Sequence, residues 1–200
     1  GDVAWYIAEI ATVLGVTLED VLQRNIDKLD TIKEHLLSLG CTHWRLFTVF
    51  PVGRGATDSK LQLTSQQMRQ LMEYIAATRK EGRISAQYGC EGFLGAYEGE
   101  VRDRFFACQA GVTVGSVLVD GAISACASIR ADYHQGNIYT DDFWQVWNTR
   151  FEQYRNREWM KKDGCADCKF FRYCKGGAMH LRDGEGKLLL CHIEKLAHGE

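Results

Sequence analysis

Residues 165–191 read CADCKFFRYCKGGAMHLRDGEGKLLLC and contain four cysteines, Cys165, Cys168, Cys174 and Cys191. Two residues separate the first pair, so one tight turn can direct both sulfurs to the same side. The segment Asp183–Gly186 predicts a turn, after which Lys187–Leu190 would return as a strand and deliver Cys191. Four thiolates gathered in this way would form a closed ligand shell for a soft metal ion or an iron–sulfur cluster. The spacing alone leaves zinc and an iron–sulfur cluster both open.

Three more cysteines form a second candidate set. Cys108 and Cys126 lie on either side of Asp120-Gly121, a strong hairpin signal, so the returning strand would bring Cys126 toward the level of Cys108. Cys90, in a glycine-flanked loop, is a third candidate ligand. A lone cysteine is usually a small buried hydrophobe, and we expect that simpler role for Cys41 at a helix-to-strand junction.

The composition indicates an ordinary globular protein. The chain has 200 residues, 46% hydrophobic residues and a formal net charge of −2, which predicts one or two compact domains. We expect no nucleic-acid partner and no membrane association, because no basic patch and no apolar run of membrane-spanning length is present. With no secretion signal to favour disulfides, reduced metal-binding cysteines in a cytoplasmic protein are expected.

The first 89 residues predict helices followed by β/α units. Two amphipathic helices are expected within residues 3–14 and 17–29, and a third from Thr31 to Leu39, ending at Gly40. The apolar run Trp44–Phe50 predicts a buried strand of a parallel sheet. A helix that starts with the capping box Thr64-x-x-Gln67 would follow and lead to a strand over Arg83–Tyr88. This order is typical of α/β barrel units, but these units are too few to close a barrel.

The second half predicts hairpins and one aromatic helix. Thr140–Asp142 would cap a helix that carries Phe143, Trp144, Trp147, Phe151 and Tyr154. We expect the two tryptophans to pack in the core. Phe170, Phe171 and Tyr173 lie beside the cysteines and would exclude water from a site there.

The order Cys-x12-Gly-x4-Cys, then Cys-x2-Cys-x5-Cys, then a final Cys resembles the SPASM domain of radical SAM enzymes. The resemblance covers residues 31–197 and implies an iron–sulfur domain with auxiliary 4Fe-4S clusters beside a partial (β/α)6 barrel. It implies that Cys165, Cys168, Cys174 and Cys191 hold the second auxiliary cluster. The strand Trp44–Phe50 and the loop after it resemble a late barrel strand near bound S-adenosylmethionine, which makes Arg54 a candidate cofactor-binding residue.

The chain departs from that family at two places. Ala178 stands where the family has a further cysteine ligand of the first auxiliary cluster, so a second cluster would depend on Cys90, Cys108 and Cys126. His180 is an alternative ligand there. No Cys-x3-Cys-x2-Cys triad occurs in the sequence, so we expect this chain not to cleave S-adenosylmethionine; that cofactor would belong to a complete enzyme.

Residues 1–29 resemble the closing half of the MazG-like NTP pyrophosphatases. Asp2, and with it Glu9, would be the magnesium ligands that this resemblance implies. Two carboxylates are too few for an octahedral catalytic site, so a helical pair that packs against a partner or another copy is the preferred interpretation.

Together these features predict an α/β (α+β overall) chain with three parts. A helical segment would occupy residues 1–30, partial barrel units residues 31–89, and a small SPASM-like domain of hairpins and a helix residues 90–200. The expected function is that of the cluster-binding region of a radical SAM/SPASM oxidoreductase acting on a peptide or protein, with an electron-transfer partner. A zinc-stapled structural module and a remnant of a magnesium-dependent nucleotide pyrophosphatase are the alternatives.

Overall fold

A computed structural model describes residues 26–197 of the chain. The chain folds into two compact units, each of which is described by itself. The first contains the residues up to Gly89, Leu94–Phe105 and the residues from Leu190; the second contains Cys90–Phe93 and Phe106–Leu189. The two helices predicted within residues 3–25, with Asp2 and Glu9, lie outside the described residues.

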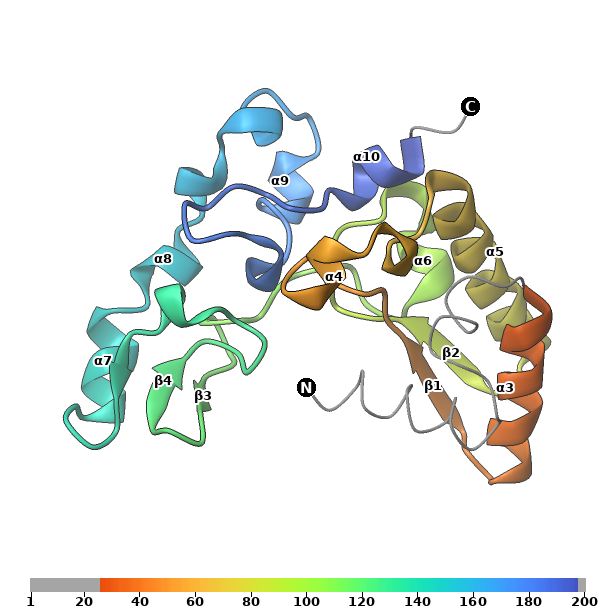
Figure 1. Ribbon diagram of the computed structural model, residues 1–200, viewed down its shortest axis with the longest axis horizontal. Coiled ribbons are helices and arrows are strands. Elements are labelled where there is room, and N and C mark those ends of the chain that lie inside the picture. Colours follow the sequence, from red (N-terminus) through yellow and green to blue (C-terminus); the bar gives the residue numbers. More distant parts are fainter. Residues whose placement is uncertain (1–25, 198–200) are drawn as a thin grey trace. The chain divides into compact units, whose positions relative to one another are not determined.

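The first unit is built on a parallel strand–helix–strand motif. Strands β1 (His43–Leu46) and β2 (Ser85–Tyr88) pair in parallel, with His43 opposite Ser85 and Leu46 opposite Tyr88. Helix α5 (Ser65–Glu81) connects them and packs on β2, and α3 lies on the same side of the strands (Figure 1). The other α-helices described in this unit are α3 (Ile26–Ser38), α4 (Arg54–Thr57), α6 (Glu98–Val101) and α10 (His192–Ala197).

Helix α5 begins as its sequence predicts. The Thr64 hydroxyl accepts a hydrogen bond from the Gln67 N–H at 3.2 Å, and Gln67 Oε1 accepts one from the Thr64 N–H at 2.8 Å. The helix ends at Gly82, whose φ of 75° is left-handed. Its apolar face buries Met68, Met72 and Ile75 against a core that includes Leu46, Ala86, Tyr88, Leu94 and Val101.

The predicted buried strand Trp44–Phe50 is wrong in its extent. Strand β1 ends at Leu46, and of its four residues only Leu46 is buried. The single neighbouring strand ends at Tyr88, so the ladder has no partner beyond that point except the Gly89 N–H, which donates to the Leu46 carbonyl at 2.8 Å. The residues after Leu46 therefore run as a loop to α4.

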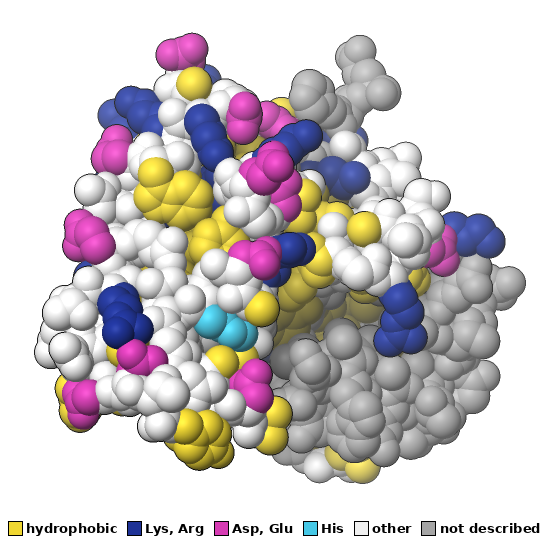
Figure 2. Space-filling view, turned by 60° about the vertical axis from the view of Figure 1, so that its left-hand side comes forward, with side chains coloured by type: hydrophobic (Ala, Val, Ile, Leu, Met, Phe, Trp, Pro, Cys, Tyr) yellow, Lys and Arg dark blue, Asp and Glu magenta, His cyan; other side chains and the backbone are white. Residues whose placement is uncertain are grey.

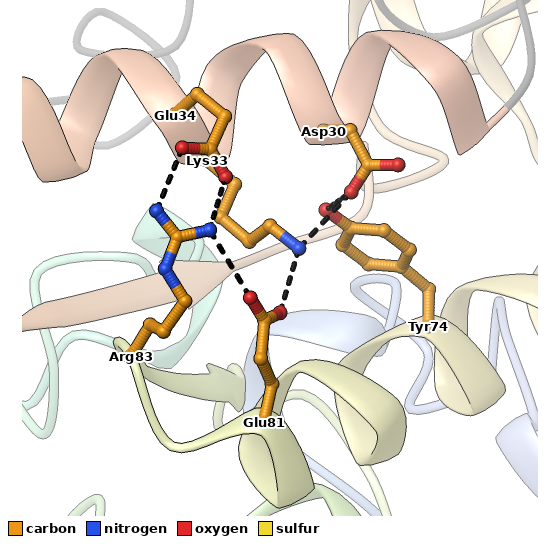
Figure 3. Close-up of polar contacts among 6 residues, drawn as sticks. All are labelled: Asp30, Lys33, Glu34, Tyr74, Glu81 and Arg83. Carbon is orange, nitrogen blue, oxygen red and sulfur yellow. Dashed lines mark hydrogen bonds and ion pairs between the residues drawn. The ribbon is translucent and has the colours of Figure 1, made fainter.

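The predicted start of a helix at Thr31 is also wrong, because α3 runs without a break from Ile26. Asp30 does not cap a new helix there; its carboxylate pairs with Lys33 at 3.1 Å and accepts a hydrogen bond from the Tyr74 hydroxyl at 2.9 Å. Figure 3 shows how this pair continues into a network that joins α3 to α5 and to the start of β2. Lys33 bonds Glu81 at 2.8 Å, and Arg83 pairs with both Glu34 and Glu81.

The second unit contains a small antiparallel sheet in the order β3-β4-β5. Strands β3 (Ser116–Val117) and β4 (Ala122–Ser124) form the predicted hairpin, and β5 (Gly136–Asn137) pairs with the other edge of β4. Gly121 turns the hairpin with a φ of 82°, a left-handed conformation that glycine adopts without strain. Helices α7 (Phe143–Thr149), α8 (Glu152–Arg155) and α9 (Phe171–Cys174) follow.

The aromatic helix begins as predicted but is interrupted. The Asp142 side chain caps α7 by accepting from the Gln145 N–H at 2.7 Å. The Trp147 carbonyl then accepts a hydrogen bond from the Arg155 guanidinium at 2.7 Å, and Phe151 and Tyr154 lie beyond the break between α7 and α8. Trp147 packs against the core, but Trp144 is 66% exposed, so its predicted core position is wrong.

Residues 26–197 have a mixed α/β fold with one small parallel sheet and one small antiparallel sheet. They form no barrel, because two parallel strands of four residues cannot close one. No helix in this range is long and apolar enough to cross a membrane. On the face shown in Figure 2, acidic and basic side chains are interspersed, in keeping with the small net charge.

Candidate metal centre

The structure gathers the candidate cysteines of the second unit into two groups of three. The first, which we call the hairpin trio, consists of Cys90, Cys108 and Cys126. Desolvation by the surrounding protein raises the pKa of the Cys90 thiol, and the nearby Cys108 and Cys126 thiols raise it further. Thiols that disfavour one another's ionisation lie close together. The three thiols of the hairpin trio are therefore near enough to interact electrostatically, and their convergence on one cluster stays a prediction.

The loop after Cys165 positions the second group, which we call the loop trio: Cys165, Cys168 and Cys174. A 3-10 turn (Asp163–Cys165) and helix α9 carry them, and the Cys168 carbonyl accepts from the Phe171 N–H at 3.0 Å. Burial raises the pKa of Cys174, and Cys165 and Cys168 raise it further. All three lie in the second unit, where Cys165 and Cys168 pack against its core.

Backbone donors face the Cys174 sulfur. Lys175, Gly176 and Gly177 are consecutive left-handed residues, with φ values of 49°, 81° and 84°. This turn directs the Gly176 N–H to the Cys174 thiol, where it opposes the rise in the pKa of that thiol; the Gly177 N–H donates to the Cys174 carbonyl at 2.9 Å and lowers the same pKa less. Successive N–H donors around one point stabilise negative charge, and hydrogen bonds to sulfur are one of the factors that set cluster potentials.

Two buried arginines hold the segments that carry the trios. The Arg157 guanidinium donates to the Cys108 carbonyl at 3.0 Å and to the Gly177 carbonyl at 3.3 Å, so it joins a segment of the hairpin trio to the turn that follows Cys174. Arg182 donates to the Gly176 carbonyl at 2.6 Å and lies 3.8 Å from the Cys165 sulfur. Neither arginine belongs to a sequence motif that predicts these contacts.

A cavity of about 290 Å³ lies between the trios in the second unit. Cys108 and Cys174 both line it, one from each trio, together with Tyr173, Arg155 and Lys175. A single open space therefore reaches both sets of thiols.

The donor chemistry of the trios is that of thiolates, which bind both zinc and iron–sulfur clusters. Within residues 26–197, no three His, Cys, Asp or Glu side chains are gathered tightly enough to hold one metal ion. The eight cysteines are all free thiols, as both ligand chemistries require.

The other predicted site residues have separate positions. Cys191 belongs to the first unit, directly before α10, and its convergence with the loop trio stays a prediction. The turn that leads to it is confirmed: Asp183–Gly186 reverses the chain, but only one antiparallel bridge, Arg182 to Leu188, follows in place of the predicted strand.

Four further residues singled out in the sequence have the following surroundings. Arg54 is an exposed residue of α4. Ala178, at the position of the family's missing ligand, is completely buried, and His180 lies buried in a 3-10 turn (Met179–Leu181). Cys41 packs beside Ile32, Leu36 and Ile84, the apolar role expected for a lone cysteine.

Comparison with known proteins identifies part of the chain. Residues 108–169 match the SPASM family, an iron–sulfur cluster-binding domain, so this segment of the chain is such a domain. The match includes Cys108, Cys126, Cys165 and Cys168. No curated protein and no solved structure matches the chain, and nothing supports the resemblance of residues 1–29 to nucleotide pyrophosphatases.

Proposed function

We propose that the chain is the auxiliary-cluster region of a radical SAM/SPASM oxidoreductase that modifies a peptide or protein. The observation that carries the proposal is the pairing of a SPASM match with two cysteine trios in one compact unit. SPASM domains are typical of radical SAM enzymes. The proposed partners are an electron-transfer protein and a peptide or protein substrate.

The proposed ligand sets follow the two trios. Cys165, Cys168 and Cys174 would hold one 4Fe-4S cluster, with Cys191 as the fourth ligand. Cys90, Cys108 and Cys126 would hold a second cluster through three thiolates, because Ala178 offers no sulfur. Residues 31–89 and 90–200 would be the barrel-derived and cluster-binding parts, and Arg54 would face the cofactor in the complete cytoplasmic enzyme.

Bound clusters would supply one-electron transfer to or from a substrate. The protein's own residues would fix the thiolates and control their surroundings. Phe171 is buried in the same unit and would shield the loop trio from water. Tyr173, on which Phe93 stacks with a ring-centroid distance of 5.8 Å, is 43% exposed and borders the cavity. The Gly176 and Gly177 N–H groups would favour the more negative, reduced state of the cluster that Cys174 binds.

Alanine variants of the whole chain test the two ligand sets separately. After anaerobic reconstitution with iron and sulfide, Cys126→Ala and Cys168→Ala should each lose the iron of one cluster and keep the other. Cys41→Ala is the control and should match the parent, because Cys41 packs in the apolar core of the first unit. An unchanged iron content in Cys126→Ala would contradict a cluster at the hairpin trio. An unchanged iron content in Cys168→Ala would contradict a cluster at the loop trio.

A further inference from the structure

Arg182 is a buried cation without a carboxylate partner. The residue is 1% exposed. Its guanidinium donates to the carbonyls of Gly186 and Gly176, each at 2.6 Å, and to the Cys165 sulfur at 3.8 Å. Within the described part of the chain it makes no ion pair, and its Nε–H has no hydrogen-bond partner.

Burying the Arg182 charge without a carboxylate partner costs free energy of folding. Ionised groups in protein interiors are normally paired, because carbonyl dipoles replace only part of the hydration that a guanidinium loses. Arg182 contacts the Cys165 thiol and lies over the Trp159 ring at 5.9 Å, and its charge also acts on the nearby Tyr133 hydroxyl. A thiolate bound to a cluster is anionic, so a loaded loop trio would supply the missing counter-charge.

Arg157 repeats the same arrangement in the same unit. It is 7% exposed, and its partners are the backbone carbonyls of Tyr154, Gly177, Cys108 and Ala110. It makes no ion pair with a described residue either. Two buried guanidinium groups beside two sets of thiols indicate an interior built for a negatively charged occupant.

The absence of a side chain at Gly176 leaves space for the Arg182 guanidinium. A Cβ added at Gly176 would lie 2.7 Å from Arg182 Nη2, closer than real side-chain contacts allow. Only glycine at that position lets the guanidinium reach the Gly176 carbonyl and the Cys165 sulfur together. The geometry of the turn and the position of the arginine thus depend on each other.

We propose that Arg182 positions Cys165 and raises the reduction potential of the cluster bound by the loop trio. A cation close to a ligating sulfur stabilises the reduced cluster more than the oxidised one, because the reduced cluster carries one more negative charge. The inference rests on the proposed function and adds to it the residue that tunes one of the two sites.

A redox titration of the reconstituted chain tests this role. The whole chain with Cys126→Ala, which leaves the loop trio as the site under test, is compared with the same chain carrying Arg182→Met, Arg182→Lys or Arg172→Met. Iron and acid-labile sulfide are measured first, and the midpoint potential is then followed by electron paramagnetic resonance during reduction with dithionite. Arg172 is the matched control, because it is an exposed arginine close to Cys174 in sequence.

Arg182→Met should lower the midpoint potential, with an expected tenfold shift in the ratio of oxidised to reduced cluster, about 59 mV for one electron. Arg182→Lys should lower it less, because an ammonium keeps the charge but cannot span the same three acceptors. Arg172→Met should match its parent.

An unchanged potential in a fully loaded Arg182→Met protein would overturn the inference and leave cluster binding intact. If Arg182→Met loses its iron, Arg182→Lys becomes the test of the inference. A midpoint potential of Arg182→Lys equal to that of the parent would then overturn it. A parent protein that takes up neither iron nor sulfide would instead overturn the proposed function, and the inference with it.

Discussion

At the scale of single residues, the two glycines after Cys174 allow backbone strain to be separated from crowding by neighbouring side chains. Gly176 and Gly177 both have left-handed backbones, so either would be strained by a side chain. A Cβ at Gly176 would also meet Arg182 and Met160 at 2.7 and 2.8 Å, but one at Gly177 would meet only Leu188, at 3.7 Å. Strain is common to both positions, and crowding belongs to Gly176 alone.

Alanine should therefore destabilise the protein more at Gly176 than at Gly177. We expect Gly177→Ala to cost about 1–2 kcal/mol of the free energy of unfolding from backbone strain. Gly176→Ala should add a further ~1–3 kcal/mol for the displaced neighbours. Urea unfolding of the two variants and the parent measures the difference. Equal losses at both positions would mean that Arg182 and Met160 move aside freely.

At the scale of elements, the network in Figure 3 joins α3 to α5 through groups that titrate. Hydrogen bonds from Lys33 and Tyr74 lower the pKa of Asp30, Arg83 lowers that of Glu34, and Lys33 and Arg83 lower that of Glu81. Glu81 raises the pKa of Lys33, and burial with the bond to Asp30 raises that of Tyr74. The network is thus complete near neutral pH and weakens toward both extremes.

The acid side of that dependence can be measured. A carboxylate whose pKa is lowered by folding stabilises the protein above its unfolded pKa, and this contribution is lost as the pH falls through the folded pKa. The midpoint temperature of thermal unfolding, followed by circular dichroism, should fall as the pH is lowered from about 6 to about 3. The decline should extend to this low pH because the folded-state pKa values of these carboxylates lie below their ordinary range. Lys33→Met should lower the midpoint at neutral pH and make this decline shallower.

Lys80→Met is the control for that experiment, because Lys80 is exposed and approaches Glu100 only at 4.0 Å. Its curve should follow that of the parent. A Lys33→Met curve parallel to the parent's across the whole range would show that the Lys33 contacts do not hold α3 to α5.

Local signals in the sequence predicted some elements well. The capping box at Thr64, the left-handed end at Gly40 and the hairpin at Gly121 depend on neighbouring residues, so their patterns sufficed. The length of β1 depended on a distant strand, which the local apolar pattern does not show. The convergence of the cysteines stays a prediction from their spacing, and the buried arginines were missed because they belong to no recognised motif.

At the scale of the whole molecule, candidate ligand cysteines lie within the SPASM segment and on both sides of it. Residues 108–169 are an iron–sulfur cluster-binding domain, and Cys90 and Cys174 complete the two trios from outside that match. Two buried cations lie among these thiols. Thiols, N–H donors and buried positive charge are all suited to an anionic metal–sulfur group.

The most direct test of this account is the metal and acid-labile sulfide content of the whole chain purified and kept without oxygen. The account predicts iron and sulfide in equal amounts and a brown chromophore, both abolished when Cys165, Cys168 and Cys108 are replaced together by alanine. Zinc without sulfide, in a colourless protein that takes up no iron on reconstitution, would contradict it.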